Sequence, residues 1–101
     1  MDPRIRASRR QEKKLAHDIG GHTTAGSGNG WAVKNDVRNP EWSIECKTTT
    51  KQSYTLTHAA LTAAEKNALL DFRRMAFAIE MRGRTWVVLP YETFVSLIGE
   101  D

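Results

Sequence analysis

The stretch that decides the fold runs from residue 35 to residue 47 and reads Asn-Asp-Val-Arg-Asn-Pro-Glu-Trp-Ser-Ile-Glu-Cys-Lys. Its second half alternates apolar and polar residues, as a β-strand with two different faces does. The apolar face would carry Trp42, Ile44 and Cys46. The polar face would carry Ser43, Glu45 and Lys47. The alternation therefore predicts that Glu45 and Lys47 project side by side, roughly 7 Å apart along the strand.

An acidic residue precedes this strand within the same stretch. Asp36 is followed by eight intervening residues and then by Glu45. Asn39 and Pro40 lie between them and both favour turns, so we expect the segment around Asp36 to fold back as an antiparallel neighbour. Asp36 would then stand across from Glu45 on one face of the sheet. Two carboxylates beside an amine suit a site for a hard metal ion with a basic assistant.

The pattern of Asp36 followed by Glu45-Cys46-Lys47 resembles the signature of the PD-(D/E)XK nuclease superfamily. The usual Pro before the Asp is replaced by Asn35, a departure that we expect to touch no catalytic group. The resemblance implies an α/β (α+β) fold with a restriction-endonuclease-like core, in which helices flank a mixed central sheet. It also implies a metal-dependent endodeoxyribonuclease, that is, a phosphodiester hydrolase.

The resemblance also implies roles for individual residues. Asp36 and Glu45 would be the principal ligands of Mg²⁺, with Mn²⁺ as a substitute, and the backbone carbonyl of Cys46 would be a further ligand. Lys47 would orient the attacking water or stabilise charge on the phosphate. Junction-resolving members of the superfamily carry a Glu on the first helix that completes the metal site, and Glu12 would take that place. No small-molecule cofactor is expected.

Length and composition fit one small domain spanning residues 1–101, with 40% hydrophobic residues. No run approaches the ~18 apolar residues of a membrane span, and no apolar signal region follows the charged N-terminus. The single Cys46 excludes an internal disulfide and fits a reducing cytoplasm, including a host cytoplasm if the protein is phage-encoded.

The positive charge is concentrated at the N-terminus. The formal net charge is +3 overall, yet residues 1–14 alone hold six basic against two acidic residues, or +4. We expect a flexible basic arm over residues 1–6 and a basic helix after it, which would suit DNA, although a solvated helix face is the alternative. The residues expected to contact DNA are Arg4, Arg6, Arg9, Arg10, Lys13, Ser27, Lys34, Lys51 and Tyr54.

The first helix is predicted over residues 7–19, with Ser8 as its cap and Gly20-Gly21 as its stop. Glu12 falls on the apolar stripe of this helix and should point inward. A buried Glu needs a partner. That partner is either a neighbouring Arg or, as the resemblance suggests, the metal site.

A glycine-rich loop at residues 26–30 follows a short β-prone run at residues 22–25. It lacks the Lys-Ser/Thr ending of a P-loop. A Gly-Ser-Gly occupies the matching place in archaeal Holliday junction resolvases and in related small phage resolvases. This makes Ser27 a candidate contact for DNA phosphate or for the metal-bound water, with an ordinary hairpin loop as the alternative. Residues 31–38 are predicted as the second strand.

The second half of the chain is predicted to be scaffold. A helix over residues 62–74 would start at a Thr62 capping box, after a short helical turn at residues 58–61. Two strands would follow at residues 75–81 and 85–89, and then a last helix over residues 91–98. The side chains expected inside are Leu61, Ala64, Ala68, Leu69, Phe72, Phe94, Leu97 and Ile98. The resulting order is α-β-β-β-α-β-β-α, which is also the order of the restriction-endonuclease-like core.

These expectations favour a Mg²⁺-dependent, structure-selective endonuclease of the small phage or archaeal Holliday junction resolvase kind. Paired cuts in a four-way junction would need a C2 homodimer, with apolar groups around Phe77, Trp86 and Phe94 as its contact. Alternatives are a nicking, restriction-type or single-strand nuclease, or a non-cutting DNA-binding or assembly module with this fold. The three His residues lack metal-ligand spacing, and one Cys excludes a Cys-type zinc finger.

Overall fold

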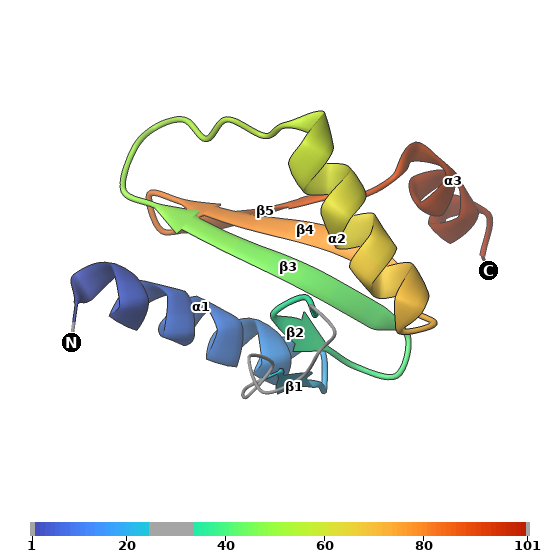
Figure 1. Ribbon diagram of the computed structural model, residues 1–101, viewed down its shortest axis with the longest axis horizontal. Helices are drawn as coiled ribbons and strands as arrows, with labels where there is room; N and C mark the ends of the chain where they lie inside the picture. The colour runs from blue at the N-terminus through green and yellow to red at the C-terminus, as the bar shows by residue number, and fades with distance from the viewer. Residues whose placement is uncertain (1, 25–33, 101) are drawn as a thin grey trace.

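The computed structural model describes residues 2–24 and 34–100 and shows an α+β fold built on one mixed sheet (Figure 1). The elements are α1 (Pro3–Asp18), β1 (His22–Thr23), β2 (Val37–Arg38), β3 (Trp42–Thr49), α2 (His58–Leu70), β4 (Arg74–Met81), β5 (Arg84–Val88) and α3 (Tyr91–Gly99). The strands lie in the order β1-β2-β3-β4-β5, with β3 and β4 parallel and the other neighbours antiparallel. The predicted class is confirmed, and the predicted order of elements is matched in outline.

The central strand β4 separates two hydrophobic clusters. Ala76 and Ala78 belong to the cluster that α1 covers, whereas Met75, Phe77 and Ile79 belong to the cluster that α2 covers. Large and small side chains therefore alternate along this strand, with the small ones toward α1 and the large ones toward α2. Because helices cover both faces, β4 is buried throughout its middle, as expected of an interior strand. Phe77 is 1% exposed, so the expectation that it contributes to a dimer contact is wrong.

The helix α1 begins earlier than predicted. The Asp2 carboxylate accepts a hydrogen bond from the Arg4 backbone N–H at 2.7 Å and so caps the helix. Pro3 takes the first helical position, where its missing N–H leaves no bond unmade. The segment is helical from Pro3 onward, so the predicted flexible arm over residues 1–6 is wrong. Ser8 lies inside the helix and does not cap it.

Two glycines turn the chain from α1 into β1, as the sequence predicts. Gly20 has a φ of 64°, in the left-handed region that favours glycine. Gly21 packs against the Arg38 backbone carbonyl so closely that a Cβ would collide with it. The second glycine therefore allows β1 to lie against β2.

The helix α2 starts at His58, so the predicted start at Thr62 is wrong. Thr57 caps the helix, since its hydroxyl accepts a hydrogen bond from the Ala60 N–H at 3.0 Å. The Thr62 hydroxyl instead donates to the Ala59 carbonyl at 3.1 Å, inside the helix. A capping-box sequence can sit within a helix when another Thr stands at the true start.

The same helix also ends earlier than predicted. It stops at Leu70, because Phe72 adopts a left-handed φ of 57° and the Arg73 N–H bonds back to the Ala68 carbonyl. Ala64 and Ala68 are buried as predicted. Leu69 and Phe72 are 66% and 95% exposed, so their predicted place in the core is wrong. The apolar residues at the end of α2 lose contact with the sheet where the chain turns toward β4.

The last helix, α3, contains no buried residue. Phe94 and Ile98 are 51% and 67% exposed, so the prediction that they point inward is wrong. The chain enters α3 from the edge strand β5, and Figure 1 shows the helix at one end of the molecule, beyond α2. Among residues 2–24 and 34–100, no second layer covers its apolar face. No helix within residues 2–24 and 34–100 is long and apolar enough to cross a membrane.

The second predicted strand is shorter than expected where the structure describes it. Of residues 31–38, only Val37 and Arg38 pair with β3, and residues 31–33 lie outside the described part of the chain. Ser27 and the rest of the glycine-rich loop lie outside it as well. Asn35 and Asp36 precede β2 without belonging to a strand. The candidate site is built where this pairing begins.

Candidate active site

Asp36 lies at the edge of β3, just before β2 begins. Val37 pairs with Ile44, which places Asp36 across from Glu45 as the sequence predicts. The Asp36 N–H donates to the Ile44 carbonyl at 3.0 Å, and the Asp36 Oδ2 accepts from the Cys46 N–H at 2.9 Å. The side chain thus satisfies a β3 donor that β2 does not reach, because β2 starts only at Val37. This bond fixes the carboxylate against β3.

Glu45 and Lys47 project from the same face of β3, as predicted. The Lys47 Nζ lies 3.8 Å from the Glu45 Oε2. The Glu45 side chain is 25% exposed and the Lys47 side chain is 44% exposed. The carboxylate therefore sits deeper than the ammonium, which stands at the opening of the site.

The two carboxyl groups share one site. Burial raises the pKa of Glu45 to about 8, and the hydrogen bond to Asp36 and the charge of that residue add to the effect. The Lys47 ammonium opposes the rise in this pKa but does not cancel it. Two neighbouring carboxylates cannot both ionise easily without a cation between them. The pair therefore holds a proton near neutral pH, and a bound cation would replace that proton.

Glu12 brings a third carboxyl group toward this pair from α1. Burial and then the charge of Asp36 raise the pKa of Glu12, while the charge of Arg9 lowers it. The charge of Glu12 in turn raises the pKa of Glu45. Glu12 is half-buried, which agrees with the predicted inward direction. Both partners considered from the sequence, a neighbouring Arg and the acidic site, act on it.

Gln11, which sequence reasoning missed, anchors α1 beside the site. It is 5% exposed, and its Nε2 donates to the Lys47 carbonyl at 2.9 Å and to the Ala78 carbonyl at 3.4 Å. The available signal was its spacing of four residues from Leu15, which places it on the buried stripe. The anchor holds the neighbouring Glu12 at the rim of the sheet.

The Cys46 side chain faces the α1-side cluster, as predicted from the alternation. Burial is the main reason why the pKa of its thiol is raised, so the group stays protonated and packs as a small apolar side chain. The N–H and C=O of one strand residue point to the same edge of the strand. The Cys46 carbonyl accordingly faces the edge where Asp36 lies.

The donor set fits a hard divalent cation. Carboxylate and carbonyl oxygens are the ligands that Mg²⁺ prefers, and the raised pKa values of Glu12 and Glu45 mean that Arg9 and Lys47 do not fully offset the clustered carboxylates. Within residues 2–24 and 34–100, no three His, Cys, Asp or Glu side chains converge closely enough to hold a metal ion alone. Mg²⁺ is commonly held by one or two carboxylates together with waters and substrate phosphate. Asp36 and Glu45 fit that mode.

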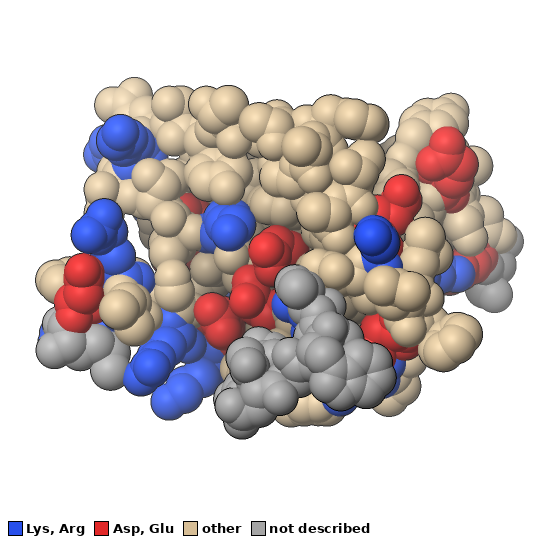
Figure 2. All heavy atoms as spheres, viewed as in Figure 1, with Lys and Arg blue, Asp and Glu red and all other residues tan. Residues whose placement is uncertain are grey.

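Basic side chains lie next to the acidic site. Figure 2 shows acidic side chains across the middle of one face, with basic side chains beside them over α1. A shallow hollow on α1 is lined by Arg6, Arg9, Arg10, Lys13 and Lys14. A second hollow is lined by Pro3, Arg4, Ala7, Ser8 and residues 48–51. Most of the predicted basic residues thus line hollows on α1, and the hollow that contains Arg4 and Lys51 reaches the end of β3.

Two of the residues predicted to contact DNA lie elsewhere. Tyr54 is half-buried and packs against the α2-side cluster, so much of its ring serves the core. Lys34 is exposed at the start of the second described segment. Thr48, Thr49, Thr50 and Lys51, at the end of β3 and directly after it, line the hollow beside Arg4.

No protein-family model, curated protein or solved structure matches the chain. The likeness to the PD-(D/E)XK superfamily therefore rests on the spacing of Asp36, Glu45 and Lys47 and on the order of the elements. We treat both the family and the activity as proposals below.

Proposed function

We propose that this chain is a Mg²⁺-dependent, structure-selective DNA endonuclease of the PD-(D/E)XK kind that resolves four-way junctions. The observation that carries the proposal is the paired carboxylates of Asp36 and Glu45, with Lys47 Nζ 3.8 Å from Glu45. Phosphodiester hydrolysis needs neutralised phosphate charge and a placed water, and this group of side chains supplies the residues for both.

Asp36 and Glu45 would hold the Mg²⁺, with Glu12 and the Cys46 carbonyl completing its surroundings. The bound cation supplies Lewis-acid neutralisation of phosphate charge. Lys47 donates hydrogen bonds to the phosphate or to the attacking water from the opening of the site. An ammonium on a flexible stem suits this role, because it can follow the shift of charge during the reaction.

The basic surface of α1 would hold the DNA backbone on either side of the scissile phosphate. Arg9, Arg10 and Lys13 line one hollow, and Arg4 and Lys51 line the other. Phosphate contacts of this kind position the nucleic acid without reading its sequence. Such binding is expected of an enzyme that recognises the shape of a branch.

A homodimer would supply the two active sites that paired cuts require. The helix α3 exposes the apolar side chains of Tyr91, Phe94, Val95 and Ile98. The edge strand β5 beside it adds Trp86 and Val87, which are about half exposed on opposite faces of the strand, with Arg84 over the Trp86 ring. An exposed apolar group of this size on a small domain is typical of an interaction surface. A second copy of the chain is the partner that the two-fold symmetry of a junction favours.

A gel assay tests the function directly. Labelled four-way junction and linear duplex of the same sequences are incubated with the protein, with and without Mg²⁺. Paired nicks in the junction that require Mg²⁺ support the proposal. Equal cutting of linear duplex would favour a restriction-type nuclease, a single nick per junction a nickase, and binding without cutting a non-catalytic module.

A further inference from the structure

Asn35, the residue directly before Asp36, is 2% exposed although its side chain is polar. Its Nδ2 donates to the Ser43 Oγ at 3.0 Å and to the Ala64 carbonyl at 2.9 Å. Its Oδ1 accepts from the Asn67 Nδ2 at 3.3 Å. Both ends of this buried amide are hydrogen-bonded, as buried polar groups must be to avoid a large desolvation penalty. The amide joins the segment before β2 to both β3 and α2.

The chemistry of this contact selects Asn over other residues. A backbone carbonyl only accepts, so the Ala64 carbonyl requires a donor, and the Asn67 amide nitrogen requires an acceptor. Asn35 offers both within one short side chain. Leu would make none of these three hydrogen bonds, and neither would Pro, the usual residue at this place in the resembled family.

The backbone around Asn35 is held as firmly as its side chain. The Thr24 hydroxyl donates to the Asn35 carbonyl at 2.5 Å, and the Thr24 N–H donates to the Asp36 carbonyl at 2.9 Å. On the opposite side, the Asp36 N–H donates to the Ile44 carbonyl. The peptide that carries Asp36 is therefore fixed between the chain after β1 and strand β3.

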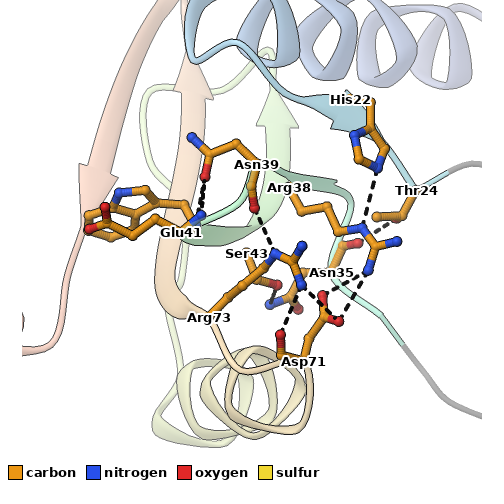
Figure 3. A network of polar contacts seen from close by, with 10 residues as sticks. His22, Thr24, Asn35, Arg38, Asn39, Glu41, Ser43, Asp71 and Arg73 are labelled. Atoms are coloured by element: carbon orange, nitrogen blue, oxygen red, sulfur yellow. Dashed lines mark hydrogen bonds and ion pairs between the residues drawn. The ribbon is translucent and has the colours of Figure 1, made fainter.

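A second tie holds the other end of this segment. Arg38 NH1 donates to both carboxylate oxygens of Asp71, at 3.1 and 3.0 Å, at the end of α2. Arg73 also pairs with Asp71, and its Nε donates to the Asn39 carbonyl at 2.6 Å. Figure 3 shows these side chains converging from β2, the following turn and the end of α2. The four residues that contain Asp36 are thus tied to α2 at both ends.

We propose that Asn35 is a positioning residue, which holds the Asp36 carboxylate against the Cys46 N–H and opposite Glu45. Residues that orient a metal ligand commonly change metal affinity or activity when they are replaced. The consequence for catalysis rests on the function proposed above, whereas the consequence for the position of Asp36 does not. The two can therefore be measured separately.

The Cys46 amide proton reports the position of Asp36 without any reaction. In the wild type it donates to a carboxylate, so its NMR signal should lie downfield and exchange slowly. Asn35→Leu should remove this signature to nearly the extent that Asp36→Ala does. Leu61→Ala, which trims the α2-side cluster without touching Asn35, is the control and should leave the Cys46 signal in place.

The second measurement concerns the metal. Mn²⁺ binding is titrated calorimetrically without DNA, and junction cleavage is followed at rising Mg²⁺. Asn35→Leu should weaken Mn²⁺ binding about 10- to 100-fold, and excess Mg²⁺ should recover part of the cleavage rate. Junction affinity without metal should stay within about twofold of the wild type, because the basic residues of α1 are unchanged.

Milder variants guard against a failure to fold. Ser43→Ala and Asn67→Ala each remove one partner of Asn35, and each should shift the Cys46 signal partway. A folded Asn35→Leu protein with an unchanged Cys46 signal would overturn the proposal, as would two milder variants with no effect. If the wild type neither binds Mn²⁺ nor cuts DNA, the proposed function fails, while the Cys46 signal still decides the role of Asn35.

Discussion

The two edges of the sheet depart from ordinary packing in opposite ways. On the side of the sheet formed by β2, which only the two-residue strand β1 separates from the edge and which we call the β2 edge, polar side chains are buried: Asn35 and Ser43 are 2% and 3% exposed. At the β5 edge, apolar side chains face outward: Trp86 and Phe94 are 49% and 51% exposed. A chain of this size has little core to spare, so neither arrangement is the one that stability alone would favour.

The difference indicates what each edge is for. Buried, fully bonded amides hold a segment in one position, which a group of carboxylates needs if it is to bind a cation in defined geometry. Exposed apolar side chains gain most when another surface covers them. We therefore interpret the β2 edge as the candidate active site and the β5 edge, with α3, as the proposed dimer interface.

The largest expected effect is the loss of cleavage when a residue of the candidate active site is replaced. Glu45→Gln and Lys47→Ala should each reduce junction cleavage about 10²- to 10³-fold or more, because each removes charge used on the transition state. Junction binding without metal should persist. Glu92→Gln and Lys66→Ala, on α3 and α2, are the matched controls and should cut normally. Wild-type cleavage by Lys47→Ala would refute the site.

A substitution of Glu12 tests whether α1 contributes to the candidate active site. Glu12→Gln should slow cleavage about 10- to 100-fold with little change in melting temperature, because it removes a carboxylate from the acidic group and keeps the shape. Asp18→Asn on the same helix, which breaks exposed pairs with Lys14 and His17, is the control. A large fall in melting temperature with normal activity would mean that Glu12 serves stability.

Much of the β2 edge could be predicted from the sequence, because the strand period determines it. Alternation along β3 placed Glu45 beside Lys47, and the turn before it placed Asp36 opposite. The network that holds Asp36 could not be found in the same way. Asn35 looked like a neutral exchange for Pro, since its partners at Ser43 and Asn67 come from different elements and no local pattern joins them.

At the β5 edge, the sequence predicted buried side chains that the structure shows to be exposed. The apolar spacing of α3 and of the end of α2 predicted burial, and the periodicity is real. Periodicity says that one face is apolar, but not that the rest of the chain supplies a surface to cover it. Phe72 and Phe94 stay exposed because the sheet ends at β5 and α2 ends at Leu70.

A charged side chain on α3 should weaken the proposed homodimer. Phe94→Asp should weaken a homodimer about 10- to 100-fold, because a central aromatic contact is commonly worth 1–3 kcal/mol. Light scattering at micromolar concentration would show a shift from dimer to monomer. Glu92→Gln on the same helix is the control. If the wild type is a monomer both alone and on a four-way junction, the proposed dimer interface is wrong.

The smallest expected effect is on the pH dependence of stability. It distinguishes the candidate active site from the proposed dimer interface without any DNA. Burial and the neighbouring Asp36 hold the pKa of Glu45 near 8 in the folded chain, whereas the unfolded value is near 4.5. Between these values the folded state binds more protons than the unfolded state, so stability should fall as pH rises from about 5 to about 8.

Glu45→Gln, which cannot ionise, should flatten this slope, with a change in melting temperature of a few degrees for each pH unit, on the order of 1 kcal/mol per unit. Mg²⁺ added near pH 8 should raise the melting temperature of the wild type, since it favours the ionised carboxylates, and should have less effect on the variant. Phe94→Asp should keep the slope, because the proposed dimer interface carries none of these acids. Thermal scans from pH 5 to pH 8, with and without Mg²⁺, measure all three. An unchanged slope in Glu45→Gln would show that Glu45 does not hold the proton that a cation at the β2 edge would displace.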